Sequence, residues 1–143
     1  MTVNRVSPTD ADELVREQGY IHLDVRSIPE FEAGHPAGAY NIPLMHKTAA
    51  GMAPNPAFIS EVESNFGKDG KIVLGCRSGG RSLRAAEMLQ AVGFTHVVDQ
   101  RAGWGGARDA FGQVQEPGWE ASGLPTAMTA EQGRDYDSLR SKG

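Results

Sequence analysis

The sequence predicts an α/β domain with a mainly parallel central sheet flanked by helices. Two observations carry this prediction. Segments with strand character alternate with helical segments through the first hundred residues, as in parallel sheets. Residues 71–75 form a short apolar run that suits a strand buried on both faces. A chain of 143 residues has the length of one domain, which we assign to residues 1–125.

Capping residues and apolar spacing mark the first elements. Thr9 and Asp12 fit a Ser/Thr-x-x-acid capping pattern, and Asn55 precedes Pro56 as a cap precedes a first helical position. Before residue 70 the expected elements are a helix from about residue 7 to Gly19, a strand at 21–25, a short helix opening at 27–30, an extended piece at 39–42, a loop at 45–54 and a helix after Asn55.

The second half is predicted to continue the same alternation. After the strand at 71–75, the apolar residues Ala85, Met88 and Leu89 share one face of a helix that Gly93 ends. Residues 95–98 are expected to form another strand. Residues 126–143 are polar and lack apolar periodicity, so we expect a frayed C-terminal tail.

Composition excludes several classes of protein. Asp and Glu outnumber Lys and Arg by 18 to 14, which argues against general nucleic-acid binding. A single cysteine excludes a disulfide scaffold, and the apolar runs are too short for a membrane span. The first residues carry no signal or transit pattern, so a cytoplasmic location is expected. The four histidines lack metal-ligand spacing, and neither a metal nor another cofactor is expected.

The chemistry is expected in the loop Cys76-Arg77-Ser78-Gly79-Gly80-Arg81, between the buried strand and the next helix. The carboxyl end of a parallel strand is where α/β sheets bind ligands. The glycine pair lets backbone amides turn inward, the helix N-terminus adds partial positive charge, and the arginines add full charges. Each of these favours a thiolate at Cys76 and an anionic substrate beside it.

Loop length separates two anion chemistries that use a cysteine. Cysteine phosphatases carry an arginine six positions after the nucleophile, but here Ser82 occupies that position and Arg81 comes one earlier. The shorter loop suits one added sulfur atom better than a tetrahedral phosphate.

The chain resembles the single-domain rhodaneses, which are sulfurtransferases with a three-layer fold. Three motifs, in the family's order, carry the resemblance and together frame about residues 5–125. They are an N-terminal signature within residues 23–43, the active-site loop at residues 76–82 and a C-terminal signature at residues 119–125.

The resemblance implies that Cys76 takes the outer sulfur of thiosulfate or a related anionic donor as a persulfide. Cyanide, a cellular thiol or a protein thiol then removes that sulfur. Loop residues 77–81 would bind the donor. Asp24, Arg26 and Ser82 would support the loop, with Asp24 accepting hydrogen bonds that brace it.

One segment departs from the family pattern. Residues 107–118 separate a Gly-Gly pair from Trp119, where the family has only a few residues, and they form either part of the active-site rim or a peripheral loop. Two further hypotheses stay open beside the enzyme, the first of them motivated by this segment. One is a persulfide carrier or sensor serving a protein partner, and the other is a weak cysteine phosphatase or arsenate reductase. The oligomeric state and the physiological sulfur donor and acceptor are not determined by the sequence.

Overall fold

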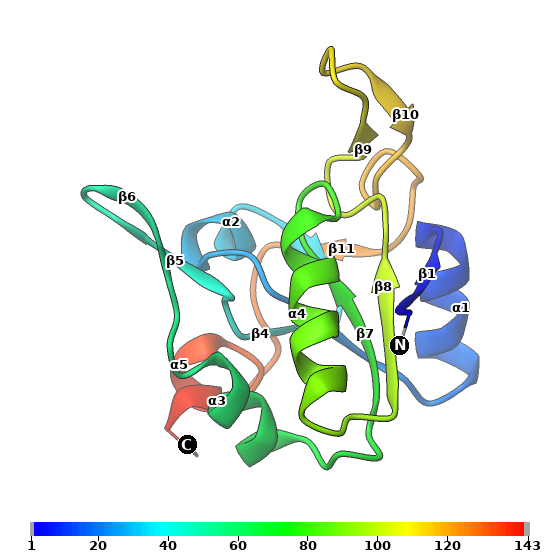
Figure 1. The fold of residues 1–143 in the computed structure, drawn as a ribbon. Helices are drawn as coiled ribbons and strands as arrows, with labels where there is room; N and C mark the ends of the chain where they lie inside the picture. Colours follow the sequence, from blue (N-terminus) through cyan, green and yellow to red (C-terminus); the bar gives the residue numbers. More distant parts are fainter. Residues whose placement is uncertain (1, 142–143) are drawn as a thin grey trace.

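A five-stranded parallel sheet forms the centre of the protein (Figure 1). The computed structural model describes residues 2–141. The strands lie in the order β1 (Asn4–Val6), β8 (His96–Gln100), β7 (Lys71–Gly75), β2 (Ile21–Asp24) and β4 (Tyr40–Asn41). The α/β prediction with a mainly parallel sheet is confirmed, and β7 lies in the middle.

Helices cover both faces of the sheet and give it two hydrophobic cores. Successive strand residues point to opposite faces, so Ile72 and Leu74 enter one core while Val73 enters the other. The larger core lies under α3 (Phe58–Asn65), α4 (Gly80–Ala91) and α5 (Tyr136–Arg140), and the smaller lies under α1 (Pro8–Glu17). A short fifth helix, α2 (Ile28–Glu32), follows β2.

Two helices begin differently from the sequence prediction. Ser7, and not Thr9, caps α1, because its hydroxyl accepts a hydrogen bond from the amide of Asp10 at 3.1 Å. The predicted helix start at Pro56 is also wrong, since α3 begins at Phe58. Asn55 instead donates to the carbonyl of Pro43, which anchors the preceding chain.

Three antiparallel two-stranded ribbons lie outside the central sheet. The expected loop at residues 45–54 is a hairpin of β5 (Met45–Thr48) and β6 (Gly51–Pro54). Residues 107–118 include a second hairpin, β9 (Ala107–Arg108) with β10 (Val114–Glu116), which projects from the body in Figure 1. These hairpins have little buried surface, so the sequence lacks the alternation that identifies a strand. The third ribbon pairs β3 (His35–Pro36) with β11 (Thr126–Ala127).

The C-terminal segment packs against the domain, in contrast to the frayed tail that we expected. Tyr136 and Leu139 of α5 are 5% and 2% exposed and belong to the larger core. The Tyr136 hydroxyl also donates to Glu61 at 2.7 Å. A five-residue helix with two inward residues is too short to show periodicity. The final two residues of the expected tail lie outside the described ones.

Across residues 2–141, no helix combines the length and the apolar character that crossing a bilayer requires.

Leu139→Ala should lower the free energy of unfolding by about 2–5 kcal/mol, because it removes a buried side chain and leaves a cavity. Urea unfolding measures the change. Met128→Ala is the control, since Met128 is 70% exposed and should change stability by no more than about 0.5 kcal/mol. Equal, small effects of the two substitutions would contradict the docking of α5.

Candidate active site

Cys76 lies directly after β7, at the edge where the parallel strands end, and its loop leads into α4. The residue is only 3% exposed. Its carbonyl accepts a hydrogen bond from the amide of Trp104 at 2.7 Å, which ties the loop to the segment after β8. The cysteine is therefore held in a fixed place at the centre of the sheet edge.

Two groups donate hydrogen bonds to the sulfur of Cys76. The amide of Gly79 lies 3.1 Å from Sγ, and the hydroxyl of Ser82 lies 3.4 Å from it. The expected ring of amides from residues 77–81 is thus represented by one amide and one side-chain hydroxyl among the described residues. Ser78 and Gly80 are exposed at the surface of the loop. Both donors lie at the N-terminal end of α4, whose dipole also favours negative charge on the sulfur.

The geometry of this loop requires glycine at position 79. Gly79 has φ +97°, a left-handed conformation that disfavours other residues. A Cβ atom there would lie 2.3 Å from the carbonyl oxygen of Arg101, which is backbone and cannot yield easily. Glycine therefore allows the amide that reaches the sulfur to be placed beside β8.

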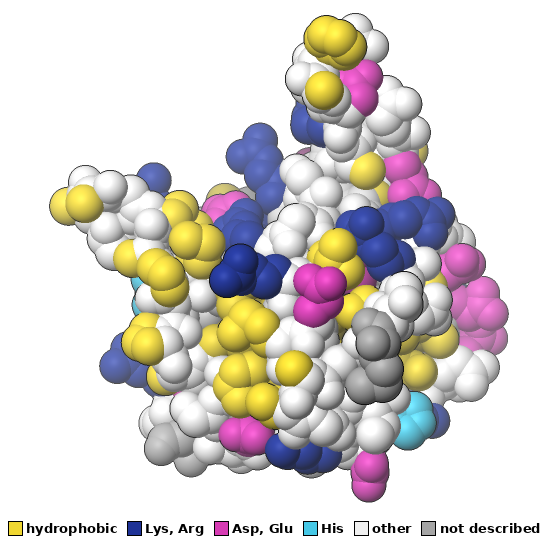
Figure 2. All heavy atoms as spheres, in the orientation of Figure 1, with side chains coloured by type: hydrophobic (Ala, Val, Ile, Leu, Met, Phe, Trp, Pro, Cys, Tyr) yellow, Lys and Arg dark blue, Asp and Glu magenta, His cyan; other side chains and the backbone are white. Residues whose placement is uncertain are grey.

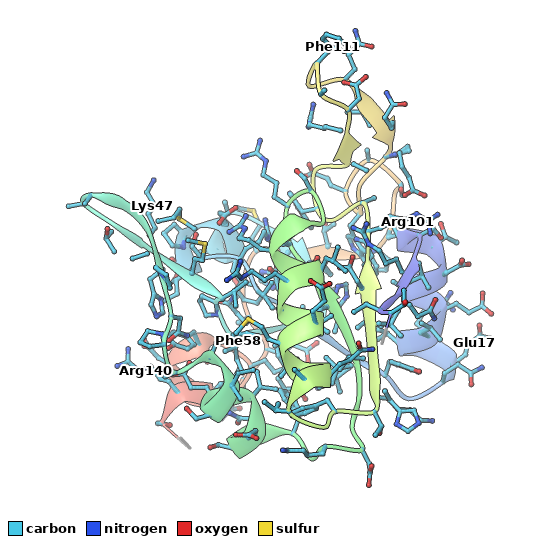
Figure 3. All side chains as sticks on the ribbon, in the orientation of Figure 1. Glu17, Lys47, Phe58, Arg101, Phe111 and Arg140 are labelled. Atoms are coloured by element: carbon cyan, nitrogen blue, oxygen red, sulfur yellow. The ribbon has the colours of Figure 1, made fainter. Side chains whose placement is uncertain are left out.

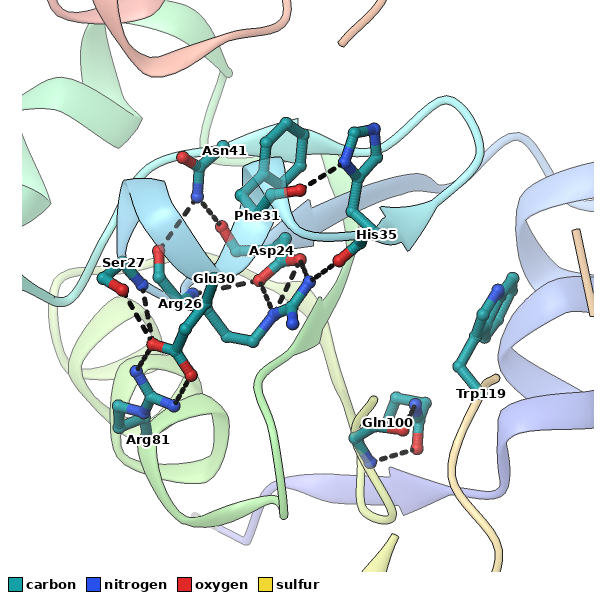
Figure 4. Close-up of polar contacts among 12 residues, drawn as sticks. Asp24, Arg26, Ser27, Glu30, Phe31, His35, Asn41, Arg81, Gln100 and Trp119 are labelled. Atoms are coloured by element: carbon teal, nitrogen blue, oxygen red, sulfur yellow. Dashed lines mark hydrogen bonds and ion pairs between the residues drawn. The ribbon is translucent and has the colours of Figure 1, made fainter. Parts of the chain in front are cut away.

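Arg81 forms an ion pair with Glu30, a residue that the sequence analysis did not assign to the site. The Arg81 guanidinium donates to both Glu30 carboxylate oxygens, at 2.8 and 2.9 Å (Figure 4). Ser27 donates to Glu30 as well, through both its amide and its hydroxyl. Burial raises the pKa of Glu30, but the hydrogen bonds from Arg81 and Ser27 outweigh it and bring the pKa to about 2. The spacing Ser27-x-x-Glu30 matches a capping box, and this was the signal in the sequence that could have drawn attention to Glu30.

This pair bears on the expected role of Arg81 in binding a donor anion. Its charge is already compensated by Glu30, and the contact joins the start of α4 to α2. Arg77, by contrast, is exposed and has no carboxylate partner within residues 2–141. Of the two loop arginines, Arg77 is the one whose charge is available to an anion.

Asp24 and Arg26 form a buried ion pair (Figure 4). Each side chain is 4% exposed, and Arg26 Nη2 lies 2.7 Å from Asp24 Oδ2. Arg26 also donates to the carbonyl of Gly34 and lies over the ring of Trp104 at 5.1 Å. The amide of Trp104 donates to the carbonyl of Cys76, so Arg26 supports the cysteine loop through Trp104. Neither Asp24 nor Arg26 donates a hydrogen bond to the Cys76 sulfur.

Two further buried groups next to the site were missed by the sequence analysis. Asp99 of β8 pairs with Arg5 at 2.8 Å, while its Oδ1 has no hydrogen-bond partner among residues 2–141. Burial raises the pKa of Asp99, against the hydrogen bond from Arg5 that lowers it. His22 lies edge-on to Trp119, and burial lowers the pKa of His22 to about 4, so the imidazole is neutral at pH 7. Within residues 2–141, no three His, Cys, Asp or Glu side chains gather as a metal site.

Gly79→Ala should lower the free energy of unfolding by about 1–3 kcal/mol, because alanine disfavours the left-handed backbone and its Cβ would clash with Arg101. Chemical denaturation measures this. Gly80→Ala is the matched control for stability, since a Cβ there meets no atom within 4 Å. Similar losses from both substitutions would show that position 79 is not specially constrained.

Glu30→Gln should lower the free energy of unfolding at pH 7 by about 1–3 kcal/mol, since it leaves the half-buried Arg81 without its ion pair. The wild-type carboxylate has a folded pKa of about 2 against an ordinary value of 4.5. Its contribution is therefore complete above pH 4.5 and is lost as the pH falls toward 2. Unfolding curves at several pH values should show the two proteins converging across that window. A difference that stays constant down to pH 2 would contradict the pair's role.

Comparisons with known proteins identify the family to which the chain belongs. A model of the rhodanese-like domain family matches residues 7–109. Thiosulfate sulfurtransferase 16, chloroplastic, of Arabidopsis thaliana is 41% identical over 121 residues, which cover 85% of this chain and 90% of that protein. The senescence-associated protein DIN1 of Raphanus sativus is 47% identical over 88 residues, and this match covers 62% of the chain and 48% of DIN1.

A solved structure is also similar over nearly the whole chain. The crystal structure of Rv0390 from M. tuberculosis superposes with a TM-score of 0.73 at 26% sequence identity, covering 90% of this chain and all of that one. The central parallel sheet, the cysteine loop that opens α4 and these similarities lead to one conclusion. The chain belongs to the rhodanese-like domain family, among whose members are thiosulfate sulfurtransferases.

Proposed function

We propose that the protein is a sulfurtransferase that moves a sulfane sulfur from thiosulfate, or a related anionic donor, to a thiophilic acceptor through a persulfide on Cys76. One observation carries the proposal: the buried Cys76 sulfur accepts hydrogen bonds from the Gly79 amide and the Ser82 hydroxyl at the start of α4. Two relatives named as thiosulfate sulfurtransferases, at 41% and 36% identity, support the choice of donor.

In the first half-reaction, the Cys76 thiolate attacks the outer sulfur of thiosulfate. A new sulfur–sulfur bond forms, the donor's own sulfur–sulfur bond breaks, and sulfite leaves with its electron pair. The exposed Arg77 is placed to attract the incoming anion. The Gly79 and Ser82 donors are already directed at the sulfur, so they stabilise its charge without a large rearrangement.

In the second half-reaction, cyanide or a thiolate attacks the outer sulfur of the persulfide. The sulfur–sulfur bond to Cys76 breaks, and the thiolate that receives the electrons returns to the same two hydrogen bonds. This is covalent catalysis in two displacements. No histidine is needed as a base, in keeping with the buried, neutral His22.

A persulfide carrier or sensor is the second candidate. The projecting β9–β10 hairpin favours this function, because a protein partner would contact the hairpin as well as the cysteine loop. The low exposure of Cys76 also favours it, since a buried persulfide is shielded from small acceptors. Intact-mass measurement separates the two functions. A stable mass increase of one sulfur with little turnover favours the carrier, and rapid thiocyanate production favours the enzyme.

Two expectations stay predictions. The phosphatase or arsenate reductase alternative is tested by hydrolysis of an aryl phosphate, and none is expected. The cytoplasmic location rests on the N-terminal sequence, while several relatives carry the words chloroplastic or mitochondrial in their names.

Cys76→Ser should lower thiocyanate formation from thiosulfate and cyanide by at least about a thousandfold, since a hydroxyl cannot carry the transferred sulfur. Circular dichroism of the variant checks that the fold is kept. Thiocyanate formation that survives the substitution, in a folded variant, would rule out the persulfide mechanism.

A further inference from the structure

The basic side chains of the protein divide into two groups by their partners. Within residues 2–141, eight lysines and arginines lie within 4.0 Å of a carboxylate. Five have no such partner, and all five are exposed: Lys47, Lys71, Arg77, Arg84 and Arg108. The protein carries a net charge of −4, yet among the described residues these five positive charges have no carboxylate beside them.

Four of these five charges lie on or near the cysteine loop, and we call them the basic rim: Lys47, Arg77, Arg84 and Arg108. Three of them, Lys47, Arg77 and Arg84, line hollows that Arg81 of the loop also lines. Lys47 is on β5, Arg84 is in α4, and Arg108 is on β9. Arg108 donates to the carbonyl of Gly105, whose amide in turn donates to the Arg77 carbonyl. Lys71, the remaining one, begins β7 and so lies at the opposite edge of the sheet.

A groove lined by methionine and charged side chains, Glu30 among them, runs beside the basic rim. Two adjoining hollows, of about 480 and 380 Å³, share Met45 and Arg81. Met88 lines the first hollow and Met52 the second. Figure 2 shows hydrophobic and basic side chains together on this face, between the β5–β6 hairpin and α4. Methionine side chains adapt readily to different partners.

The β5–β6 hairpin, which lines the groove, and the β9–β10 hairpin beyond the cysteine loop both carry apolar residues into solvent. Phe111, Val114 and Met52 are 90%, 48% and 43% exposed. In Figure 3, Phe111 lies at the tip of one hairpin and Lys47 on the other, both directed away from the body of the domain. A small thiol bound at Cys76 does not extend to these tips, whereas a protein segment does.

We propose that the basic rim, the methionine groove and the hairpin tips together form a docking surface for an acidic protein segment that carries the acceptor thiol. The inference rests on the proposed function and specifies its acceptor. The overall negative charge repels an acidic partner from the rest of the surface, while the basic rim attracts it to the site. The partner's thiol loses its proton to solvent, its thiolate attacks the outer persulfide sulfur, and the Cys76 thiolate leaves.

Binding is tested with a short synthetic peptide of Glu and Leu that has Ser in place of the acceptor Cys. A matched peptide replaces every Glu with Gln. Fluorescence anisotropy at low ionic strength should show the acidic peptide binding at least about tenfold more tightly, with the advantage falling as salt is added. Equal affinity for the two peptides would overturn the docking surface.

A matched pair of variants tests whether the charge acts locally. The rim variant combines Lys47→Ala, Arg84→Ala and Arg108→Ala. The remote variant combines Arg16→Ala, Lys68→Ala and Lys71→Ala, which changes net charge equally at the other end of the sheet. The rim variant should lose most of the preference for the acidic peptide, and the remote variant should keep it. Equal losses would show a net-charge effect and overturn the proposal.

Transfer is measured separately, with the Cys-containing forms of both peptides and a protein persulfidated by inorganic polysulfide. In each variant the rate with peptide is divided by the rate with cyanide, so that a defect in the reaction itself cancels. In the wild type and the remote variant, this ratio should be higher for the acidic peptide than for the Gln peptide. In the rim variant, the ratios for the two peptides should be similar. Failure of Cys76 to take up sulfur, seen by intact mass, would overturn the proposed function and is distinguishable from a failure of peptide binding.

Discussion

The position of one backbone amide determines the surroundings of the Cys76 sulfur, and the cysteine loop is built around it. The Gly79 amide reaches the Cys76 sulfur only because residue 79 adopts φ +97° against the carbonyl of Arg101. The next residue begins α4, so the hydrogen bond and the helix dipole act on the same atom. Both therefore direct positive electrostatic potential at a sulfur that is 3% exposed.

Two ion pairs keep this loop in place from different sides. Arg81 and Glu30 join the start of α4 to α2, and the low pKa of Glu30 reflects how strongly the carboxylate is held. Arg26 and Asp24 lie deeper and act through Trp104 on the Cys76 carbonyl. These charged side chains therefore serve to position the Cys76 loop, while Arg77 stays exposed without a carboxylate partner among residues 2–141.

Basic side chains without a carboxylate partner are unevenly distributed over the described residues. Eight basic side chains within residues 2–141 pair with carboxylates, while four of the five unpaired ones, the basic rim, lie on the cysteine loop, α4 and the two hairpins. The β9–β10 hairpin is attached to the domain by a bidentate pair between Arg101 and Glu116. The side chain of Arg101 holds the hairpin, and the backbone carbonyl of Arg101 lies against Gly79 of the cysteine loop. Arg101 therefore contacts both segments.

Local sequence was sufficient to determine the parallel α/β fold, the β7–loop–α4 unit and Cys76 at its centre. An apolar run, a glycine pair and a helical repeat are all read within a few residues of one another. Tertiary structure alone decided which donors reach the sulfur, that Arg81 pairs with Glu30 fifty-one positions away, and that α5 docks through Tyr136 and Leu139. The Arg81–Glu30 pair and the docking of α5 join segments distant along the chain, and no local pattern encodes them. The Gly79 donor is close to Cys76 in sequence, but its backbone conformation is fitted against the carbonyl of Arg101, which is distant along the chain.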